Sequence, residues 1–254
     1  MADHLKILKP CIDYLYNKNN DIEGHRIRIG GKTNYEFSER TSLGGYIAYG
    51  TKDEAIKYGI EVDHLINRKP WTTLHIERRY DVEPLDVVDE ANRKTLSFRQ
   101  QPDMALLQNP TSLLITTSAY NVTWYGAFPK IGFTHEKFQP LFPFGYLEQP
   151  NQNTDIIEDF KTSEFVFETW LSRDEQFIVE NNIRHSLGTL SAPIFIFQYR
   201  LGVSNLLGSQ LDDHKFSLRM IKTLGMGLLG KSLYTIKGGY IPTTLPFPLL
   251  QNHI

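Results

Sequence analysis

The stretch Gly44-Gly-Tyr-Ile-Ala-Tyr-Gly-Thr-Lys-Asp-Glu-Ala-Ile-Lys-Tyr-Gly59 is the most informative part of this chain of 254 residues. Tyr46-Ile-Ala-Tyr49 combines aromatic and aliphatic residues and predicts a short strand. Thr51 can then cap a helix, because Glu54 follows it at the spacing of a capping box. Gly59 is a natural stop for that helix. A strand that runs directly into a helix predicts a fold of mixed secondary structure.

The residues on either side extend this interpretation. Apolar residues recur at helical spacing in 5–16 and again in 213–229, so both segments are expected to be helical. Alternating segments such as 25–29, 72–77 and 192–199 predict strands. Together these elements predict an α+β fold, with mixed or antiparallel sheets and a few peripheral helices.

The length of the chain suits a single domain over residues 1–254. One segment, 126–153, is rich in proline, glycine and aromatic residues. Structureless loops of that length are uncommon inside a domain unless they serve a function. We therefore expect a long ordered loop there, or a junction between two halves.

Composition excludes several classes of protein. A net charge of −2 is not that of a polycationic nucleic-acid binder. The single cysteine, Cys11, excludes an internal disulfide framework and a multi-cysteine metal site, and the histidines show no metal-binding spacing, so no metal is expected. The chain begins without an apolar signal core, and no run approaches about 18 apolar residues. These features predict a soluble cytoplasmic protein with no membrane partner.

Gly225-Met-Gly-Leu-Leu-Gly-Lys-Ser232 fits the G-x-x-x-x-G-K-[ST] pattern of a phosphate-binding loop. Such a loop needs a strand before it and a helix after it, so that its N–H groups and the helix dipole meet the phosphates. Here the preceding residues are expected to be helical, and the short remainder of the chain carries Gly238-Gly239 and three prolines. We therefore expect the end of a helix, at which the glycines let neighbouring backbones approach, with no ATP or GTP at Gly225–Ser232.

Two tyrosines stand out in the stretch quoted first. Tyr46 is expected on the strand and Tyr58 at the end of the adjoining helix. Two phenol rings placed in this way could hold a flat, cationic ring by stacking and cation–π attraction. The nicotinamide ring of NAD is flat and cationic.

The same stretch resembles the middle motif of the ADP-ribosyltransferase fold, in which a G-x-Y-F-A strand runs into a helix with A-x-x-Y. His25-Arg-Ile-Arg-Ile-Gly-Gly31 resembles the first strand of that fold, and Arg173-Asp-Glu-Gln-Phe-Ile-Val179 resembles a late one. The likeness covers a minor part of the chain. It departs from the family pattern at Gln176, which separates Glu175 from Phe177, and at the first strand, which lacks a His-Gly-Thr or Arg-Gly motif.

The resemblance implies an NAD-dependent ADP-ribosyltransferase, a glycosyltransferase-type enzyme that uses NAD as a substrate and modifies a macromolecular acceptor. Glu175 would be the catalytic carboxylate that stabilises the oxocarbenium-like state as nicotinamide leaves. Glu168 would be the alternative acid. The resemblance assigns binding of the NAD adenosine and nicotinamide groups to His25, Arg26, Arg28, Tyr46 and Tyr58.

Two other interpretations stay open. The aromatic, Pro/Asn/Gln-rich middle favours a non-enzymatic structural or assembly protein, viral or phage-like, which would expose apolar patches to a partner or form a homo-oligomer. An RNA- or DNA-binding component would instead gather basic residues on one face beside exposed aromatic residues. The basic residues in question are Arg26, Arg28, Lys32, Arg78 and Arg79.

Overall fold

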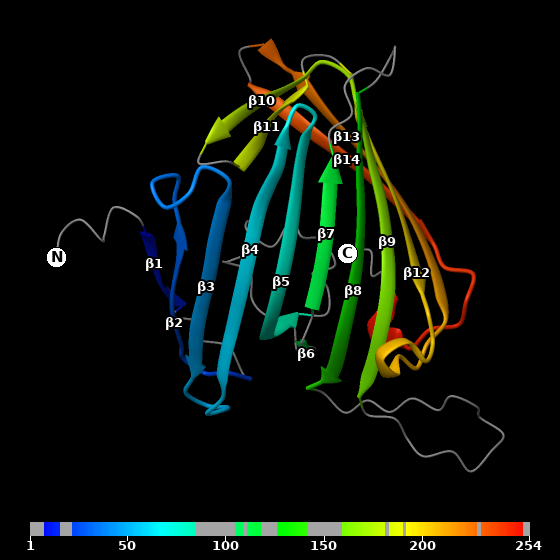
Figure 1. The fold of residues 1–254 in the computed structure, drawn as a ribbon. Helices are drawn as coiled ribbons and strands as arrows, with labels where there is room; N and C mark the ends of the chain where they lie inside the picture. Colours follow the sequence, from blue (N-terminus) through cyan, green and yellow to red (C-terminus); the bar gives the residue numbers. More distant parts are fainter. Residues whose placement is uncertain are drawn as a thin grey trace.

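The computed structural model describes residues 8–15, 22–84, 105–108, 111–117, 126–141, 159–180, 183–189, 192–227 and 230–250. Almost all of these residues lie in antiparallel strands (Figure 1). The strands are β1 (Leu8–Leu15), β2 (Arg26–Thr33), β3 (Thr41–Gly50), β4 (Ile56–Arg68), β5 (Trp71–Pro84), β6 (Ala105–Gln108), β7 (Thr111–Thr117), β8 (Gly126–Pro140), β9 (Phe160–Ser172), β10 (Glu175–Glu180), β11 (Ile183–Thr189), β12 (Ile194–Gly202), β13 (Asp213–Gly225) and β14 (Lys231–Tyr240).

Twelve of the strands form one sheet, in the order β1-β2-β3-β4-β5-β6-β8-β9-β12-β13-β14, with β7 paired to β5 and β8. The sheet is curved, so that β12, β13 and β14 turn away from the plane of β3, β4 and β5 (Figure 1). β10 and β11 form a separate two-stranded hairpin. Helical structure in the described residues is confined to short 3-10 turns such as η2 (Leu206–Gly208) and η4 (Phe247–Leu249).

The expected α+β fold is therefore wrong, because none of the three predicted helices is present in the described residues. Residues 8–15 of the first predicted helix pair with β2 as a strand. Thr51 opens a turn, in which Glu54 has a φ of 50°, and the second half of the predicted helix is the start of β4. The third is β13, which pairs with strands on both sides. Tertiary pairing here overrides local helical signals.

The proline-rich segment 126–153 is not a loop over its first half. Residues 126–140 form β8, which pairs along its length with β9 and also with β6 and β7. Pro129 is accommodated within this strand, opposite Thr169. The rest of the segment beyond Leu141 lies outside the described residues.

The two faces of the large sheet differ sharply in chemistry. One register row of paired residues crosses seven strands and is wholly apolar: Leu43, Val62, Ile76, Leu113, Phe133, Phe165 and Leu201. The adjacent row, one residue along each strand and so on the other face, holds Glu61, Glu77, Ser112, Thr134 and Glu164. We call these the apolar face and the polar face.

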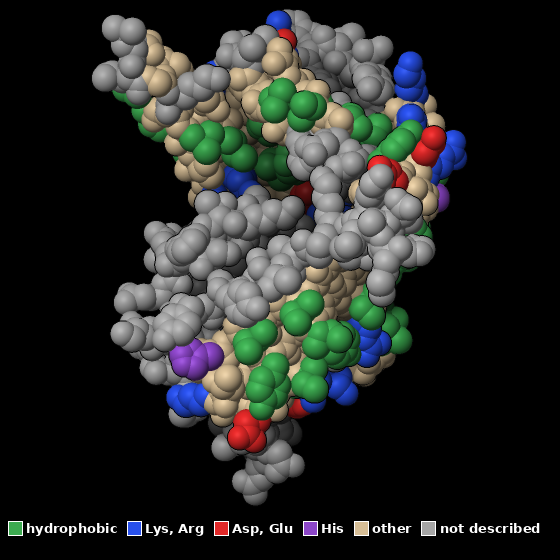
Figure 2. Space-filling model, turned by 90° about the vertical axis from the view of Figure 1, so that its left-hand side faces the viewer, with side chains coloured by type: hydrophobic (Ala, Val, Ile, Leu, Met, Phe, Trp, Pro, Cys, Tyr) green, Lys and Arg blue, Asp and Glu red, His purple; other side chains and the backbone are tan. Residues whose placement is uncertain are grey.

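Many apolar side chains of the sheet are exposed and several charged ones are buried, which is the reverse of the usual arrangement in a water-soluble protein. On the apolar face, Ile29 and Ile47 are each 63% exposed and Ile131 is 57% exposed. Hydrophobic side chains accordingly gather in clusters on the surface seen in Figure 2. Lys57 and Glu164, on the polar face, are buried. A small apolar cluster lies where the C-terminal segment packs against the sheet; it comprises Phe138, Leu211, Leu245 and Leu249, with Ile241 beside it.

Candidate functional site

The two tyrosines singled out from the sequence lie on neighbouring strands but on opposite faces. Tyr46 of β3 pairs with Gly59 of β4, whereas Tyr58 pairs with Ile47. Successive side chains of a strand point to opposite faces, so Tyr46 is on the polar face and Tyr58 on the apolar face. The ring of Tyr58 lies 6.1 Å from that of Tyr80. The structure does not bring Tyr46 and Tyr58 together as a clamp for a ring.

Tyr46 is instead fixed inside a network of protein side chains. Its hydroxyl donates to Asp81 over 2.5 Å, and the guanidinium of Arg28 lies 3.7 Å from its ring centroid. Burial and the neighbouring Asp81 carboxylate raise the pKa of the Tyr46 phenol, so it stays neutral. The cation–π contact expected with a ligand is thus made by Arg28.

The same network continues to a fully enclosed lysine. Arg26 Nη2 donates to Asp81 over 2.8 Å, and its Nη1 lies 3.4 Å from Glu23. Burial opposes ionisation of Asp81, but the hydrogen bond and charge of Arg26 outweigh it and lower the pKa of the Asp81 carboxyl. Lys57, which is 0% exposed, pairs with Glu23 at 2.7 Å and also with Asp53. We call this set the β2–β5 ion network: Glu23, Arg26, Arg28, Tyr46, Asp53, Lys57 and Asp81.

A second cluster lies on the polar face around Asp63. Lys32 Nζ contacts Asp63 at 2.7 Å and Glu61 at 2.8 Å, and His75 Nδ1 lies 2.6 Å from Asp63. Hydrogen bonds to Asp63 and Glu77 raise the pKa of His75 to about 10. Burial opposes ionisation of Asp63, but His75 and Lys32 lower its pKa to about 2. At neutral pH the imidazole is therefore a cation in an ion pair, and it is unsuited to act as a base.

A third cluster joins β9, β12 and β13. Lys215 Nζ lies 2.6 Å from Glu164 and 3.0 Å from Asp213, and Arg200 lies 3.4 Å from Glu164. Burial raises the pKa of the Asp213 carboxyl, whereas Lys215 and Arg200 outweigh burial at Glu164 and lower its pKa. All three clusters pair opposite charges from different strands, as Arg26 of β2 with Asp81 of β5 and Lys215 of β13 with Glu164 of β9, which is the arrangement expected where charges share a buried face.

The two candidate catalytic carboxylates lie apart from the tyrosines. Glu175 opens β10, and its Oε1 accepts a hydrogen bond of 2.5 Å from Ser186 within the β10–β11 hairpin. Glu168 in β9 accepts from Trp170 Nε1 at 3.1 Å and from Gln198 Nε2 at 2.8 Å. His25 lies at the start of β2, where its backbone N–H donates to Thr51. These contacts place Glu175 and Tyr46 in separate parts of the structure.

The phosphate-loop pattern at 225–232 falls on the turn between β13 and β14. Met226 N–H donates to Gly230 over 2.8 Å, and Gly227 and Gly230 have φ values of 60° and 96°. These values are in the left-handed region that favours glycine. A strand follows the turn where a phosphate loop would have a helix. The expected helix end is therefore a hairpin turn.

The described residues hold no group of three or more His, Cys, Asp or Glu side chains arranged to bind a metal ion. Within the same residues, no helix is both long enough and apolar enough to cross a membrane. Of the basic residues considered for nucleic acid, Arg26, Arg28, Lys32 and Arg79 lie on the polar face, where they contact protein side chains, and Arg78 lies on the other face. Arg26 and Arg28 belong to the β2–β5 ion network, whereas Arg78 lies one position from Arg79 and so faces the other side of β5.

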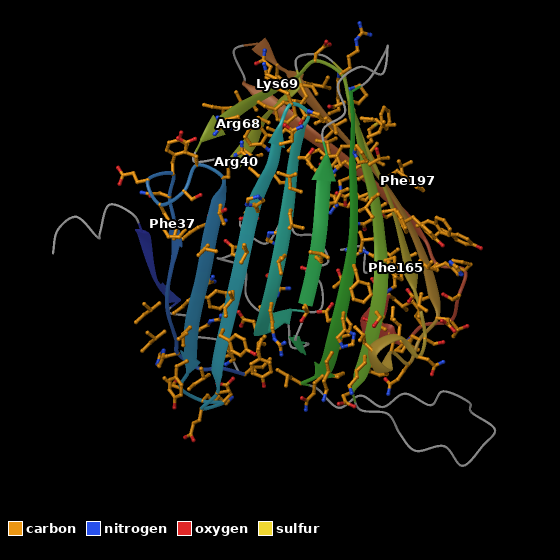
Figure 3. The ribbon with its side chains drawn as sticks, viewed as in Figure 1. Phe37, Arg40, Arg68, Lys69, Phe165 and Phe197 are labelled. Carbon is orange, nitrogen blue, oxygen red and sulfur yellow. The ribbon has the colours of Figure 1, made fainter. Side chains whose placement is uncertain are left out.

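Sequence analysis missed the feature that distinguishes the molecule, which is the apolar face. Its signal is a period of two in segments such as Ile56-Lys-Tyr-Gly-Ile-Glu-Val62 and Phe195-Ile-Phe-Gln-Tyr-Arg-Leu201. A search for long apolar runs cannot detect it, because every second residue is polar or small. Figure 3 shows two of its aromatic members, Phe165 on β9 and Phe197 on β12. No protein-family model matches this chain, and no curated protein matches it either.

Proposed function

We propose that the chain is a non-enzymatic structural protein whose large sheet is embedded in lipid, with the apolar face against the acyl chains. The observation that carries this proposal is the pair of adjacent register rows, one apolar across seven strands and the other polar. Alternation with apolar residues outward and polar residues inward is the pattern of sheets that face lipid.

Water is a poor solvent for this face. Monomeric soluble proteins rarely expose a continuous apolar patch of more than a few hundred Å². Here exposed aliphatic and aromatic side chains recur on β2, β3, β4, β8, β9, β12 and β13. Each Å² of apolar surface removed from water contributes about 25 cal/mol. A cover over the whole face would therefore be strongly favoured.

Lipid suits the seven-residue apolar row better than a folded protein partner does. The apolar positions run from Leu43 to Tyr49 on β3 and from Phe165 to Leu171 on β9. At about 3.3 Å per residue these runs are roughly 20 Å long along the strand, which is shorter than the apolar band of about 25 Å in lipid-facing sheets, where the strands are also tilted. Protein interfaces mix polar groups and arginine into the contact, whereas the seven residues of the apolar row include neither; Arg78 lies elsewhere on the same face.

The backbone also suits a medium without water. Within the described sheet, the strands from β2 to β13 have a paired neighbour on each side, so their N–H and C=O groups can be satisfied inside the protein. β14 pairs with β13 alone in this sheet, so its other edge requires a strand partner in the bilayer. The ADP-ribosyltransferase interpretation stays a prediction from the sequence, and the contacts described above do not add to it.

Adjacent residues on β12 provide a matched test. Phe197 is 45% exposed on the apolar face, and Gln198 on the polar face donates to Glu168. A Cys11→Ser background would carry Phe197→Cys or Gln198→Cys, each labelled with a fluorophore and reconstituted into vesicles with brominated acyl chains. We expect strong quenching at position 197 and much weaker quenching at position 198.

Three results would overturn the proposal. They are equal quenching at the two positions, quenching of the position-197 label only by aqueous iodide, and failure of the folded chain to associate with vesicles of any composition. Strand content measured by far-UV circular dichroism serves as the control that both labelled variants are folded.

A further inference from the structure

We infer that one end of the sheet, formed by the β2–β3 and β4–β5 turns, binds the phosphate groups of anionic lipid headgroups. This inference rests on the proposed function, because it places the turns at the membrane surface. The residues concerned are Arg40, Arg68 and Lys69, with Phe37 beside them (Figure 3).

The two turns form one shared edge. Leu65 N–H of β4 donates to the carbonyl of Arg40 over 2.7 Å, which ties the end of the β2–β3 turn to β4. The β2–β3 turn is closed by Ser38 Oγ, which accepts from the N–H groups of Arg40 and Thr41. The Asn67 side chain closes the β4–β5 turn, because its Nδ2 donates to the carbonyl of Lys69 and its Oδ1 accepts from the Lys69 N–H. The three cationic side chains are thus displayed from a fixed platform.

The charges at this end are available to a ligand. Arg40 and Lys69 are exposed, and their side chains have no acidic partner within the part of the chain that the structure describes. Arg68 has one ion pair, with Glu39 at 3.8 Å, and both of these side chains are more than half exposed. An exposed pair at that distance contributes little and is screened by salt, so it competes weakly with phosphate. Glu36 and Glu39 are the opposing charges of the turn.

The cations lie next to exposed apolar and aromatic residues at this end of the sheet. Ile66 and Leu43 are exposed apolar residues at this end of β4 and β3, and Arg68 follows Ile66 by two residues. Phe37 is 46% exposed in the adjacent turn. A change from aliphatic residues to an aromatic ring and then to Arg and Lys is what the transition from acyl chains to headgroups requires. Planar guanidinium groups match phosphate oxygens particularly well.

The test is a charge-matched comparison of vesicle binding. One variant carries Arg40→Gln, Arg68→Gln and Lys69→Gln. The control removes three lysines from the opposite end of the strands, by Lys52→Gln, Lys137→Gln and Lys161→Gln. Each cation near an anionic surface is expected to contribute about fivefold in binding, so the first variant should lose on the order of 100-fold in partitioning into phosphatidylglycerol-containing vesicles. The control variant should retain most of the binding.

On purely zwitterionic phosphatidylcholine vesicles, both variants should partition like the unmodified chain. The difference on anionic vesicles should shrink as salt is raised, because the headgroup contacts are electrostatic. Equal loss in the two variants, or no loss in the first, would overturn the headgroup assignment while membrane binding itself remained. Failure of all three proteins to bind either vesicle would instead overturn the proposed function.

Discussion

Lys57 is the clearest example of a charge that the fold has to neutralise internally. It is wholly buried and is held by Glu23 and Asp53. Removal of one partner from a buried ion pair leaves an uncompensated charge, which typically costs about 3–5 kcal/mol. We expect Lys57→Met to lower the free energy of unfolding by about that amount, measured by denaturant titration in detergent.

The matched control for this change is Arg68→Met. Arg68 has only the long, exposed pair with Glu39, so its loss should change the free energy of unfolding by less than about 1 kcal/mol. Equal effects of the two substitutions would show that the β2–β5 ion network does not depend on its buried lysine.

His75 gives the protein a pH dependence with a definite sign. Its pKa is about 10 in the folded state against 6.5 for the free side chain, so between these values the folded state holds a proton that the unfolded chain has released. The stabilisation is complete below pH 6.5, and it is lost as the pH rises through 10. Asp63, with its pKa lowered to about 2, contributes stability above its ordinary value of 3.8, which is lost as the pH falls through 2.

We therefore expect the free energy of unfolding to fall steadily as the pH is raised from 6.5 to 10. His75→Asn should remove this slope, as followed by denaturant titrations at a series of pH values. His64→Asn is the control, because the His64 ring contacts the hydroxyl of Thr41 and the substitution leaves the Asp63–His75 pair in place. A slope that persists in His75→Asn would contradict the assignment.

Sequence reasoning at this scale singled out residues that the structure shows in contact with one another. Arg28 and Tyr46 were singled out as partners of a ligand, and the structure shows them in contact with each other. The sequence could not reveal this, because their contact depends on the pairing of β2 with β3, which places Arg28 opposite Ala48, two residues from Tyr46. The residue types indicated a cation–π contact, and the register of β2 against β3 determined that its partners are Arg28 and Tyr46.

The β3–β4 hairpin is the element in which local signals and long-range pairing disagree most. Thr51 to Glu54 has capping-box spacing, but the segment forms a tight turn in which Gly50 N–H donates to Ala55. The residues that follow alternate as Ile56, Tyr58 and Ile60, which suits a strand with one apolar face. The strands expected at 25–29, 72–77 and 192–199 are confirmed within β2, β5 and β12, the first two from their alternation and the third from its continuous apolar run Ile194–Phe197.

Gly59 is a sterically constrained position of this hairpin. A Cβ atom there would overlap the ring of Tyr46 on the neighbouring strand. We expect Gly59→Ala to displace Tyr46 from Asp81 and to lower the free energy of unfolding by about 1–3 kcal/mol. Gly238→Ala is the comparison, because a Cβ at that position of β14 meets nothing within 4 Å.

The Gly238→Ala substitution should change the free energy of unfolding by no more than about 0.5 kcal/mol. Denaturant titrations of both variants, followed by far-UV circular dichroism, provide the measurement. A neutral Gly59→Ala would mean that the close approach of β3 and β4 is not required.

At the scale of the whole molecule, the sheet places its charges inside and its apolar residues outside. This arrangement predicts that the chain stays dispersed only when its apolar face is covered. We expect a single species in detergent micelles and heterogeneous aggregates after detergent removal, as measured by size-exclusion chromatography with light scattering. A discrete monomer in plain buffer would contradict the proposed function, and a discrete oligomer of fixed size would favour assembly between copies.

The fold as a whole was predictable only in part. Strands could be predicted from alternation. However, helices were predicted wrongly wherever apolar residues also recurred with a period of 3.6. The expectation of no membrane partner was based on the lack of long apolar runs. That criterion applies to helices, and a strand needs only every second residue to be apolar. Local sequence rules could not predict that β8 pairs with β9, because a proline-rich stretch separates the two strands in the sequence.

Most of the ladders join strands that follow one another along the chain, as from β1 to β5 and again from β12 to β14. A gene for such a sheet can gain or lose a two-strand unit by duplication or deletion of a short segment, because no distant strand has to find a new neighbour. Each unit gained widens both faces together, since alternate residues serve the two sides. Evolution can therefore adjust the width of the sheet in discrete steps while the chemistry of its polar face stays intact.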